Sequence, residues 1–373
     1  MKELTNNLLQ ALEASDATQA TELFTGEMAK GRDLWEIHLS LFPLIQRVLN
    51  PPFINPHLPK MYRIYRELVP YLKKDEIPIF VRLEVNEYAR RPKLEKLPKV
   101  SLLTSTVSFS DVESAIREKD WEKATVSMAT FYAQTGGTEL ARRLLLLGSG
   151  YLNDSLGHSV SCTAFILLEM LERSNQDPWP AMSTLADYFC KGGFHTTPPL
   201  QKTSPFPSNE VFDQHILRAT SGRGIVNLHH TITIYAMERV RHFFTKEEYN
   251  HMIGAWISFM EDKNSKLAVL DSHKMEPLAG YARFYEAFSR LEVKSVVASL
   301  SEMIGSPQGR AEMGRFLIKS LCDYYHGNYN PHYLTGLGSV LWVGDQYWEQ
   351  PPIVMNAFHQ YVDFLFDSLK FED

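Results

Sequence analysis

Two stretches, Ala11-Leu-Glu-Ala-Ser-Asp16 and Ala115-Ile-Arg-Glu-Lys-Asp120, repeat one pattern in different parts of the chain. Each is followed, four residues after the aspartate, by an alanine, Ala20 or Ala124, and later by a glycine. An acidic residue between two helix-forming runs is typical of a helix N-cap, and a glycine is typical of a helix end. The pattern therefore predicts a hairpin of two helices that the chain uses at least twice.

A third, weaker copy of this pattern is Ala287-Phe-Ser-Arg-Leu-Glu292, which is followed by Gly305. Apolar residues such as Leu8, Leu9 and Leu12 recur with the three- to four-residue spacing of an amphipathic helix. We therefore predict an all-α protein of helical repeats, packed into a bundle or a solenoid-like assembly.

The repeats suggest three parts within one compact unit. The charged, proline-containing stretch Arg90–Lys99 reads as a linker, so we expect an N-terminal repeat over 1–95. The central repeat, 100–280, contains an extra hairpin and the Pro-rich loop Thr196–Asn209, and the C-terminal repeat covers 281–373. A loop of this length is either a lid or a plain surface connection.

Composition limits the classes of function. The 373 residues are 44% hydrophobic, enough for a sizeable core, and the net charge of −6 argues against a broad basic face for nucleic acid or anionic lipid. The sequence lacks a secretory signal pattern and a membrane-spanning run, so we expect a cytoplasmic protein with no nucleic-acid or membrane partner. Cys162, Cys190 and Cys322 are widely spaced and suit buried, reduced thiols.

Histidines follow each copy of the repeat at a nearly constant distance. His57, His158 and His332 come 41, 38 and 40 residues after the acidic positions and are each expected to open a further helix. In Asn55-Pro-His57 and Asn330-Pro-His332, asparagine is the expected cap and histidine falls in the first turn. A fourth copy of this ending, Asn227-Leu-His-His230, lacks the preceding hairpin.

Three of the histidines have a hydroxyl three residues later. Ser161, Thr233 and Thr335 follow His158, His230 and His332 at this spacing, which places each hydroxyl beside its histidine on one helix face. The positive end of the helix dipole disfavours a charged ring, so neutral imidazole is expected. Neutral imidazole binds metals and accepts protons.

Pseudo-symmetric packing would bring these histidine-bearing helix starts together. We predict a pocket in which His57, His158, His230 and His332 act as metal ligands, the last three also as proton-handling catalytic groups. An all-imidazole ligand set suits Fe, Zn, Cu or Ni. The hydroxyls of Ser161, Thr233 and Thr335 would orient the rings. Arg223, in Thr220-Ser-Gly-Arg-Gly224, would hold an anionic group of a cofactor.

Two other interpretations of the histidines remain open. In one, a duplicated hairpin keeps histidine as a buried capping side chain without chemistry. In the other, clustered helix N-termini bind an anion through their free N–H groups.

Further constellations have plainer interpretations. Cys162 shares a face with His158 but reads better as a small core residue, and Glu169 as a salt-bridged carboxylate. Glu248-Tyr-Asn-His251 has the spacing of di-iron bundles, which need two such motifs. Because Thr245 and Glu248 also form a capping box, the glutamate needs no metal to explain it.

The repeated unit resembles the questin oxidase-like family over most of residues 107–345. Members of that family are oxygen-using enzymes of aromatic polyketide metabolism, so the resemblance implies an oxidoreductase. The family often has proline after the histidine, where this chain has Ser159, Thr231 and Tyr333. The histidines that carry the resemblance are His158, His230 and His332.

The sequence thus favours a redox or oxygen-using enzyme that acts on a small organic molecule in a histidine-lined, metal-binding pocket. A non-catalytic helical-repeat scaffold with a protein partner is the main rival. An anion-binding protein is the third hypothesis.

Overall fold

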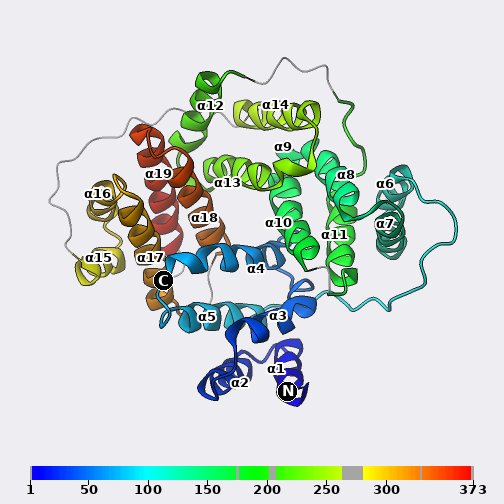
Figure 1. The fold of residues 1–373 in the computed structure, drawn as a ribbon, viewed down its shortest axis with the longest axis horizontal. Helices are drawn as coiled ribbons and strands as arrows, with labels where there is room; N and C mark the ends of the chain where they lie inside the picture. The colour runs from blue at the N-terminus through cyan, green and yellow to red at the C-terminus, as the bar shows by residue number, and fades with distance from the viewer. Residues whose placement is uncertain (1, 174–175, 201–206, 263–279, 328–329, 371–373) are drawn as a thin grey trace. The chain divides into compact units, whose positions relative to one another are not determined.

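The computed structural model describes residues 2–173, 176–200, 207–262, 280–327 and 330–370. Over these residues the chain forms 19 α-helices and two short 3-10 helices, with no β-strand beyond two isolated bridges (Figure 1). The all-α prediction is therefore confirmed. Within the same described ranges, no helix combines the length and the apolarity needed to cross a bilayer.

The chain divides into two compact units, and four of its five passages between them lie inside helices. Unit 1 comprises Met1–Arg63, Glu84–Thr203 and Ala236–Ala255, and unit 2 comprises Ile64–Leu83, Ser204–Tyr235 and Trp256–Asp373. The helices shared by both units are α4 (His57–Leu68), α5 (Ile77–Arg90), α13 (Gly224–Val240) and α14 (Lys246–Asp262).

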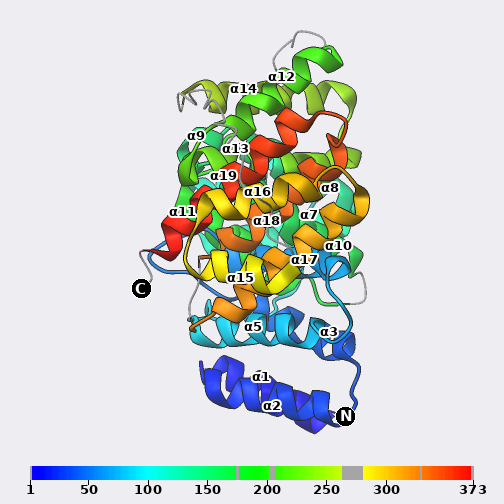
Figure 2. The same cartoon turned by 90° about the vertical axis from the view of Figure 1, so that its left-hand side faces the viewer.

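Unit 1 contains the first two copies of the repeated hairpin. Its own helices are α1 (Lys2–Glu13), α2 (Ala17–Ala29), α3 (Leu34–Ile45), α6 (Phe109–Arg117), α7 (Trp121–Thr135), α8 (Gly137–Ser149), α9 (Leu152–Ser155), α10 (His158–Glu172) and α11 (Trp179–Gly192), with the 3-10 helix η2 (Arg241–Phe243). Helices α6 and α7 lie side by side (Figure 1), as do α1 and α2 (Figures 1 and 2).

The two hairpins of unit 1 share one turn geometry. Ser15 and Lys119 adopt left-handed backbone angles, with φ of 58° and 57°, directly before the aspartate. The side chains of Asp16 and Asp120 then accept a hydrogen bond from the backbone N–H three residues later, at 2.9 Å in both turns. The predicted N-caps are therefore confirmed.

Unit 2 contains the third hairpin and the C-terminal helices. Its own elements are η1 (Val69–Tyr71), α12 (Asn209–Ser221), α15 (Gly280–Ser289), α16 (Val293–Met303), α17 (Pro307–Tyr324), α18 (His332–Gln346) and α19 (Pro351–Leu369). Between α15 and α16, Leu291 has a left-handed φ of 54°, like the other two turns, but Glu292 makes no side-chain cap. The sequence match was also weakest here. Solenoid-like packing of the repeats remains a prediction.

The helices that begin with His158 and His332 are the innermost of their units. Every residue of α10 from His158 to Met170 is buried, and α18 is buried almost all round. A helix that is apolar or small on all faces packs inside a protein rather than on its surface. In unit 1, α10 packs against α8 and α11, and in unit 2, α18 packs against α17 and α19.

One predicted helix start is wrong. Sequence equivalence with His158 and His332 placed His230 in a first turn, but α13 begins at Gly224, six residues earlier. Gly224 has a left-handed φ of 79°, which lets the chain turn out of α12 and begin the new helix at once. His230 therefore lies in the interior of α13.

Candidate metal centre

The first histidine pair lies in unit 1 and joins the starts of two helices. His57 is the first residue of α4, and His158 is the first residue of α10. Their Nε2 atoms are 2.7 Å apart, and the rings meet edge to face with centroids 4.5 Å apart. Both side chains are buried. The expectation that histidines at helix starts converge is confirmed for these two residues.

The local backbone fixes the orientation of the His158 ring. Leu156 and Gly157, both left-handed, end the short helix α9 and turn the chain into α10. The ring folds back so that Nδ1 lies 2.6 Å from the carbonyl oxygen of Ser155. Because a carbonyl oxygen can only accept, Nδ1 carries the hydrogen and Nε2 carries the lone pair. In a neutral pair, His57 can donate its Nε2–H to that lone pair.

The second histidine pair lies in unit 2. His229, in the second turn of α13, and His332, the first residue of α18, have Nε2 atoms 2.9 Å apart. The ring centroids are 4.6 Å apart, and the planes cross at 71°. These side chains are also buried.

Both Nδ1 atoms of the second pair are hydrogen-bond donors. His332 Nδ1 lies 2.7 Å from Oδ1 of Asn330, which also accepts the backbone N–H of His332 at 3.0 Å. This second bond identifies the Asn330 atom as the oxygen rather than the amide nitrogen. His229 Nδ1 donates to the carbonyl oxygen of Ile225 at 2.7 Å. In neutral His229 and His332, Nε2 therefore carries the lone pair.

This arrangement suits a shared cation. Two Nε2 lone pairs 2.9 Å apart cannot form a hydrogen bond with each other, and a proton or a metal ion could bridge them. Ligating histidines in metal sites typically donate Nδ1–H to a carbonyl or amide oxygen, as these two do.

The sequence missed His229 and favoured its neighbour His230. Adjacent residues on a helix point about 100° apart, so only one histidine of the His229-His230 dipeptide can face His332. The ring of His230 is fully buried and packs edge to face on Phe259, with centroids 4.8 Å apart. The Asn227-Leu-His-His230 motif itself was the signal. The correct choice between its two histidines required the helix phase, which the misplaced start of α13 obscured.

The predicted hydroxyls are buried on the same helices as the histidines. Thr233 donates to the carbonyl oxygen of His229 at 2.6 Å, and Thr335 donates to that of Pro331 at 3.4 Å. Ser161 is fully buried one turn into α10. Each hydroxyl lies close to the backbone around its histidine, and a role in orienting the rings remains a prediction.

A buried amine and a thiol lie one turn beyond the first pair. Lys60, three residues after His57, is fully buried, and its Nζ has no hydrogen-bond partner among the described residues. Burial lowers the pKa of Lys60, and a nearby Cys162 thiolate acts in the opposite direction. Burial also raises the pKa of the Cys162 thiol. Cys162 is a core residue, as predicted. Nothing in the repeat pattern indicated Lys60.

Arg223 lies in an ion pair rather than at an open anion site. Its Nε lies 3.1 Å from Asp363, and Nη2 donates to Nδ1 of His359 at 2.7 Å. The side chain is half-buried in the turn before α13, and burial lowers its pKa. Cofactor binding by Arg223 remains a prediction.

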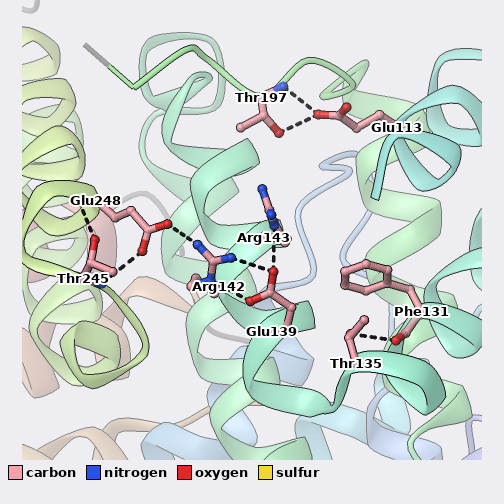
Figure 3. Close-up of polar contacts among 9 residues, drawn as sticks. All are labelled: Glu113, Phe131, Thr135, Glu139, Arg142, Arg143, Thr197, Thr245 and Glu248. Carbon is pink, nitrogen blue, oxygen red and sulfur yellow. Dashed lines mark hydrogen bonds and ion pairs between the residues drawn. The ribbon is translucent and has the colours of Figure 1, made fainter. Parts of the chain in front are cut away.

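Glu169 and Glu248 both form ion pairs with arginine. Glu169 is fully buried between Arg63, at 3.5 Å, and Arg173, at 2.5 Å. Glu248 forms the predicted capping box: it accepts the backbone N–H of Thr245 at 3.0 Å, and its own N–H donates to the Thr245 hydroxyl at 3.3 Å (Figure 3). Glu248 also forms an ion pair with Arg142 of α8.

The start of the Pro-rich loop is fastened to unit 1. Thr197 donates both its backbone N–H, at 2.8 Å, and its hydroxyl, at 2.5 Å, to Glu113 of α6 (Figure 3). Residues 201–206, at the centre of the predicted lid, lie outside the described residues.

Within the described ranges, buried histidine nitrogens that could hold a metal ion occur in both units: those of His57 and His158 in unit 1 and those of His229 and His332 in unit 2. Comparison of the chain with models of known protein families, with curated proteins and with solved structures finds no match.

Proposed function

We propose that this protein is a metal-dependent oxidoreductase in which buried histidines are the ligands of a transition-metal ion: His229 and His332 in unit 2, with His57 and His158 as a further pair in unit 1. The observation that carries the proposal is the contact between the Nε2 atoms of His229 and His332, which are 2.9 Å apart while both Nδ1 atoms donate to oxygens. Ligating histidines typically donate Nδ1–H in this way and present Nε2 to the metal.

The chemistry of the donor set fits a metal. Three of the four rings have Nδ1 held by an oxygen, of Ser155, Ile225 or Asn330, so that Nε2 carries the lone pair in each neutral ring. These oxygens would fix the tautomer and orientation of the rings before the ion arrives. Burial of the rings would exclude competing water ligands.

The nitrogen separations bear on the geometry of the ion. Two nitrogens about 2.1 Å from one metal ion are about 3.0 Å apart at a right angle and about 3.4 Å apart at the tetrahedral angle. The separations of 2.7 and 2.9 Å are those of hydrogen-bonded rings and would have to widen slightly around an ion. An all-imidazole ligand set suits iron, zinc, copper or nickel.

The redox assignment follows from the ligand type. Imidazole nitrogens suit iron and copper, and such an ion would supply one-electron and oxygen chemistry when bound. The residues of this chain would bind the ion, keep water out and orient a small organic substrate. The resemblance to the questin oxidase-like family points to the same class of reaction.

Elemental analysis of the purified full chain tests the proposal. We expect one equivalent of iron, copper or nickel, and a reversible change in the absorption or electron paramagnetic resonance spectrum on reduction and reoxidation. His229→Ala and His332→Ala should each reduce the metal content to near zero. The matched control is His242→Ala, which removes an exposed histidine outside both pairs.

The rival hypotheses predict different results. If the chain contains no stoichiometric metal and the histidine variants behave like the wild type, the hypothesis of a non-catalytic helical-repeat scaffold is favoured. Thermal stabilisation by phosphate without metal would favour the anion-binding hypothesis. Bound zinc without a redox change would retain the ligand set and overturn the oxidoreductase.

A further inference from the structure

Lys93 lies just after the end of α5, in a segment whose backbone is held in place. It pairs with Val48 in an isolated antiparallel bridge. The next residue, Leu94, donates its N–H to the Arg47 carbonyl at 2.6 Å. All four residues belong to unit 1. The side chain of Lys93 therefore starts from a fixed point on the backbone.

The amine of Lys93 bonds only to neutral oxygens. Its Nζ donates to the Ser15 hydroxyl at 3.1 Å and to the Ala89 carbonyl at 3.2 Å. The side chain is only partly exposed, and it forms no ion pair with any described residue. An ammonium group in this position loses hydration without gaining a carboxylate partner.

The carboxylate that could pair with Lys93 is bound by an arginine instead. Arg47 Nη1 donates to both carboxylate oxygens of Glu13, at 3.0 and 3.2 Å. The Nε and Nη2 atoms of the same guanidinium donate to the carbonyl of Leu94, the residue next to Lys93, at 3.0 and 2.6 Å. These bonds fix a second cation close to Lys93 and occupy the carboxylate of Glu13.

This environment favours the unprotonated amine. Burial lowers the pKa of Lys93 to about 8, with Glu13 opposing the shift and Arg47 adding to it. About a tenth of the Lys93 side chains are then free amines at pH 7. A lysine that is desolvated and lies next to another cationic group is a nucleophile, because only the free amine has a lone pair to donate.

From these contacts we infer that Lys93 is a nucleophilic amine that is acylated by an activated acyl donor, an acyl phosphate or a thioester. Nζ forms a bond to the acyl carbon, and the bond from that carbon to the phosphate or the thiolate breaks. The leaving group takes the electron pair of the broken bond, and the proton lost by Nζ goes to water. The amide product keeps one N–H, so it can retain only one of the bonds to Ser15 and Ala89.

Acetylation of the full chain at pH 7 tests the inference, with acetyl phosphate in one arm and acetyl-coenzyme A in the other. Peptide mass spectrometry measures the rate at each lysine. With at least one donor, Lys93 should be acetylated about tenfold faster than the exposed Lys119, and the faster arm identifies the class of donor. The rate at Lys93 should rise with pH and level off above about pH 8.

Two variants at one position separate the effect of charge from that of the hydrogen bond. Ser15→Asp places a carboxylate where Nζ now has a neutral acceptor, and aspartate tolerates the left-handed φ of 58° at this position. The new ion pair should raise the pKa of Lys93 and slow its acetylation about tenfold. Ser15→Ala removes the same hydrogen bond without adding a charge and should not slow the reaction.

Circular dichroism checks that each variant folds. If Ser15→Asp does not fold, Glu13→Gln replaces it: this change removes the carboxylate that favours the ammonium and should speed acetylation of Lys93. The inference would be overturned if Lys93 reacts no faster than Lys119 with either donor, or if Ser15→Asp and Ser15→Ala change the rate equally. The site lies outside the histidine pairs, and metal content should be the same in every variant, so this test is independent of the proposed function.

Discussion

The two histidine pairs share one contact but differ in their hydrogens. In both, Nε2 atoms of buried rings face each other, at 2.7 Å for His57 and His158 and at 2.9 Å for His229 and His332. In unit 1, His57 can donate to His158, so the pair can satisfy itself. In unit 2, both rings donate through Nδ1, and neither can donate to the other.

The surroundings of the two pairs differ as well. One turn beyond the first pair lie a buried amine, Lys60, and a thiol, Cys162, whereas hydroxyls that bond to backbone carbonyls follow the second pair. The backbone settings differ too, because His57, His158 and His332 begin their helices whereas His229 lies in the second turn of α13. On the proposed function, the second pair is the one that needs a cation, and the first pair can do without one.

The largest expected effect comes from the side chain that orients His332. Asn330→Ala removes the oxygen that holds His332 Nδ1, so metal affinity should fall about 10- to 100-fold, the usual cost of losing such a partner. Competition with a chelator of known affinity measures this change. Asn330→Asp, whose carboxylate also accepts the Nδ1–H, should restore the affinity.

The matched variant in the first pair is Ser155→Ala. Ser155 holds His158 through its backbone carbonyl, and its hydroxyl bonds instead to Ser159 at 2.8 Å. Metal affinity should therefore stay within about twofold of the wild type. Equal losses in Asn330→Ala and Ser155→Ala would mean that both substitutions act through the stability of the helix starts rather than through ring orientation.

A smaller effect is expected at Lys60, which distinguishes the first pair from the second. Lys60→Met removes a buried ammonium without a hydrogen-bond partner and keeps the volume, so the free energy of unfolding at neutral pH should rise by about 1–2 kcal/mol. Burial lowers the pKa of Lys60 in the folded protein, so the unfolded chain binds the proton more tightly. The destabilisation caused by the buried ammonium is complete at pH values below the pKa of Lys60 in the folded protein. It decreases as the pH rises toward 10.5, the ordinary pKa of lysine.

Urea unfolding at several pH values measures this difference. The advantage of Lys60→Met over the wild type should shrink from neutral pH toward pH 10.5. Lys119→Met changes an exposed lysine of unit 1 and is the control. A destabilised Lys60→Met with unchanged pH dependence would show that the amine has a favourable partner in the folded protein.

The local rules of helix formation made the fold largely predictable. Asp16 and Asp120 as caps and His57, His158 and His332 as helix starts follow from short-range chemistry, and all are found in the structure. The start of α13 was not predictable in the same way. The helix begins at the left-handed Gly224, but the sequence around His230 resembles the first turns at His158 and His332.

The site was predictable only as far as helix phase was known. Convergence of helix starts followed from the repeat, but the choice of His229 over His230 depends on a rotation of about 100°, which an error of one residue in the register reverses. The tautomers depend on oxygens placed by tertiary structure. Lys60 escaped notice because a lysine in a helix is usually exposed, and only packing reveals that this one is not.

The smallest expected effect is a change in the stability of the metal-free protein, which tests the difference between the two histidine pairs. His229→Gln replaces one of the two facing Nε2 lone pairs with an amide that can donate a hydrogen bond to His332 Nε2. The metal-free variant should be more stable than the metal-free wild type by about 0.5–1 kcal/mol. His57→Gln should bring no such gain, because His57 already can donate to His158.

Thermal unfolding after exhaustive chelation measures both variants, and the sign of the difference decides the matter. If the second pair is a cation site, chelation leaves it strained, and glutamine relieves the strain only there. If His229→Gln and His57→Gln change the stability of the metal-free protein equally, the two pairs are equivalent. His229 and His332 would then share a proton, which chelation does not remove, and both pairs would be structural hydrogen bonds rather than metal ligands.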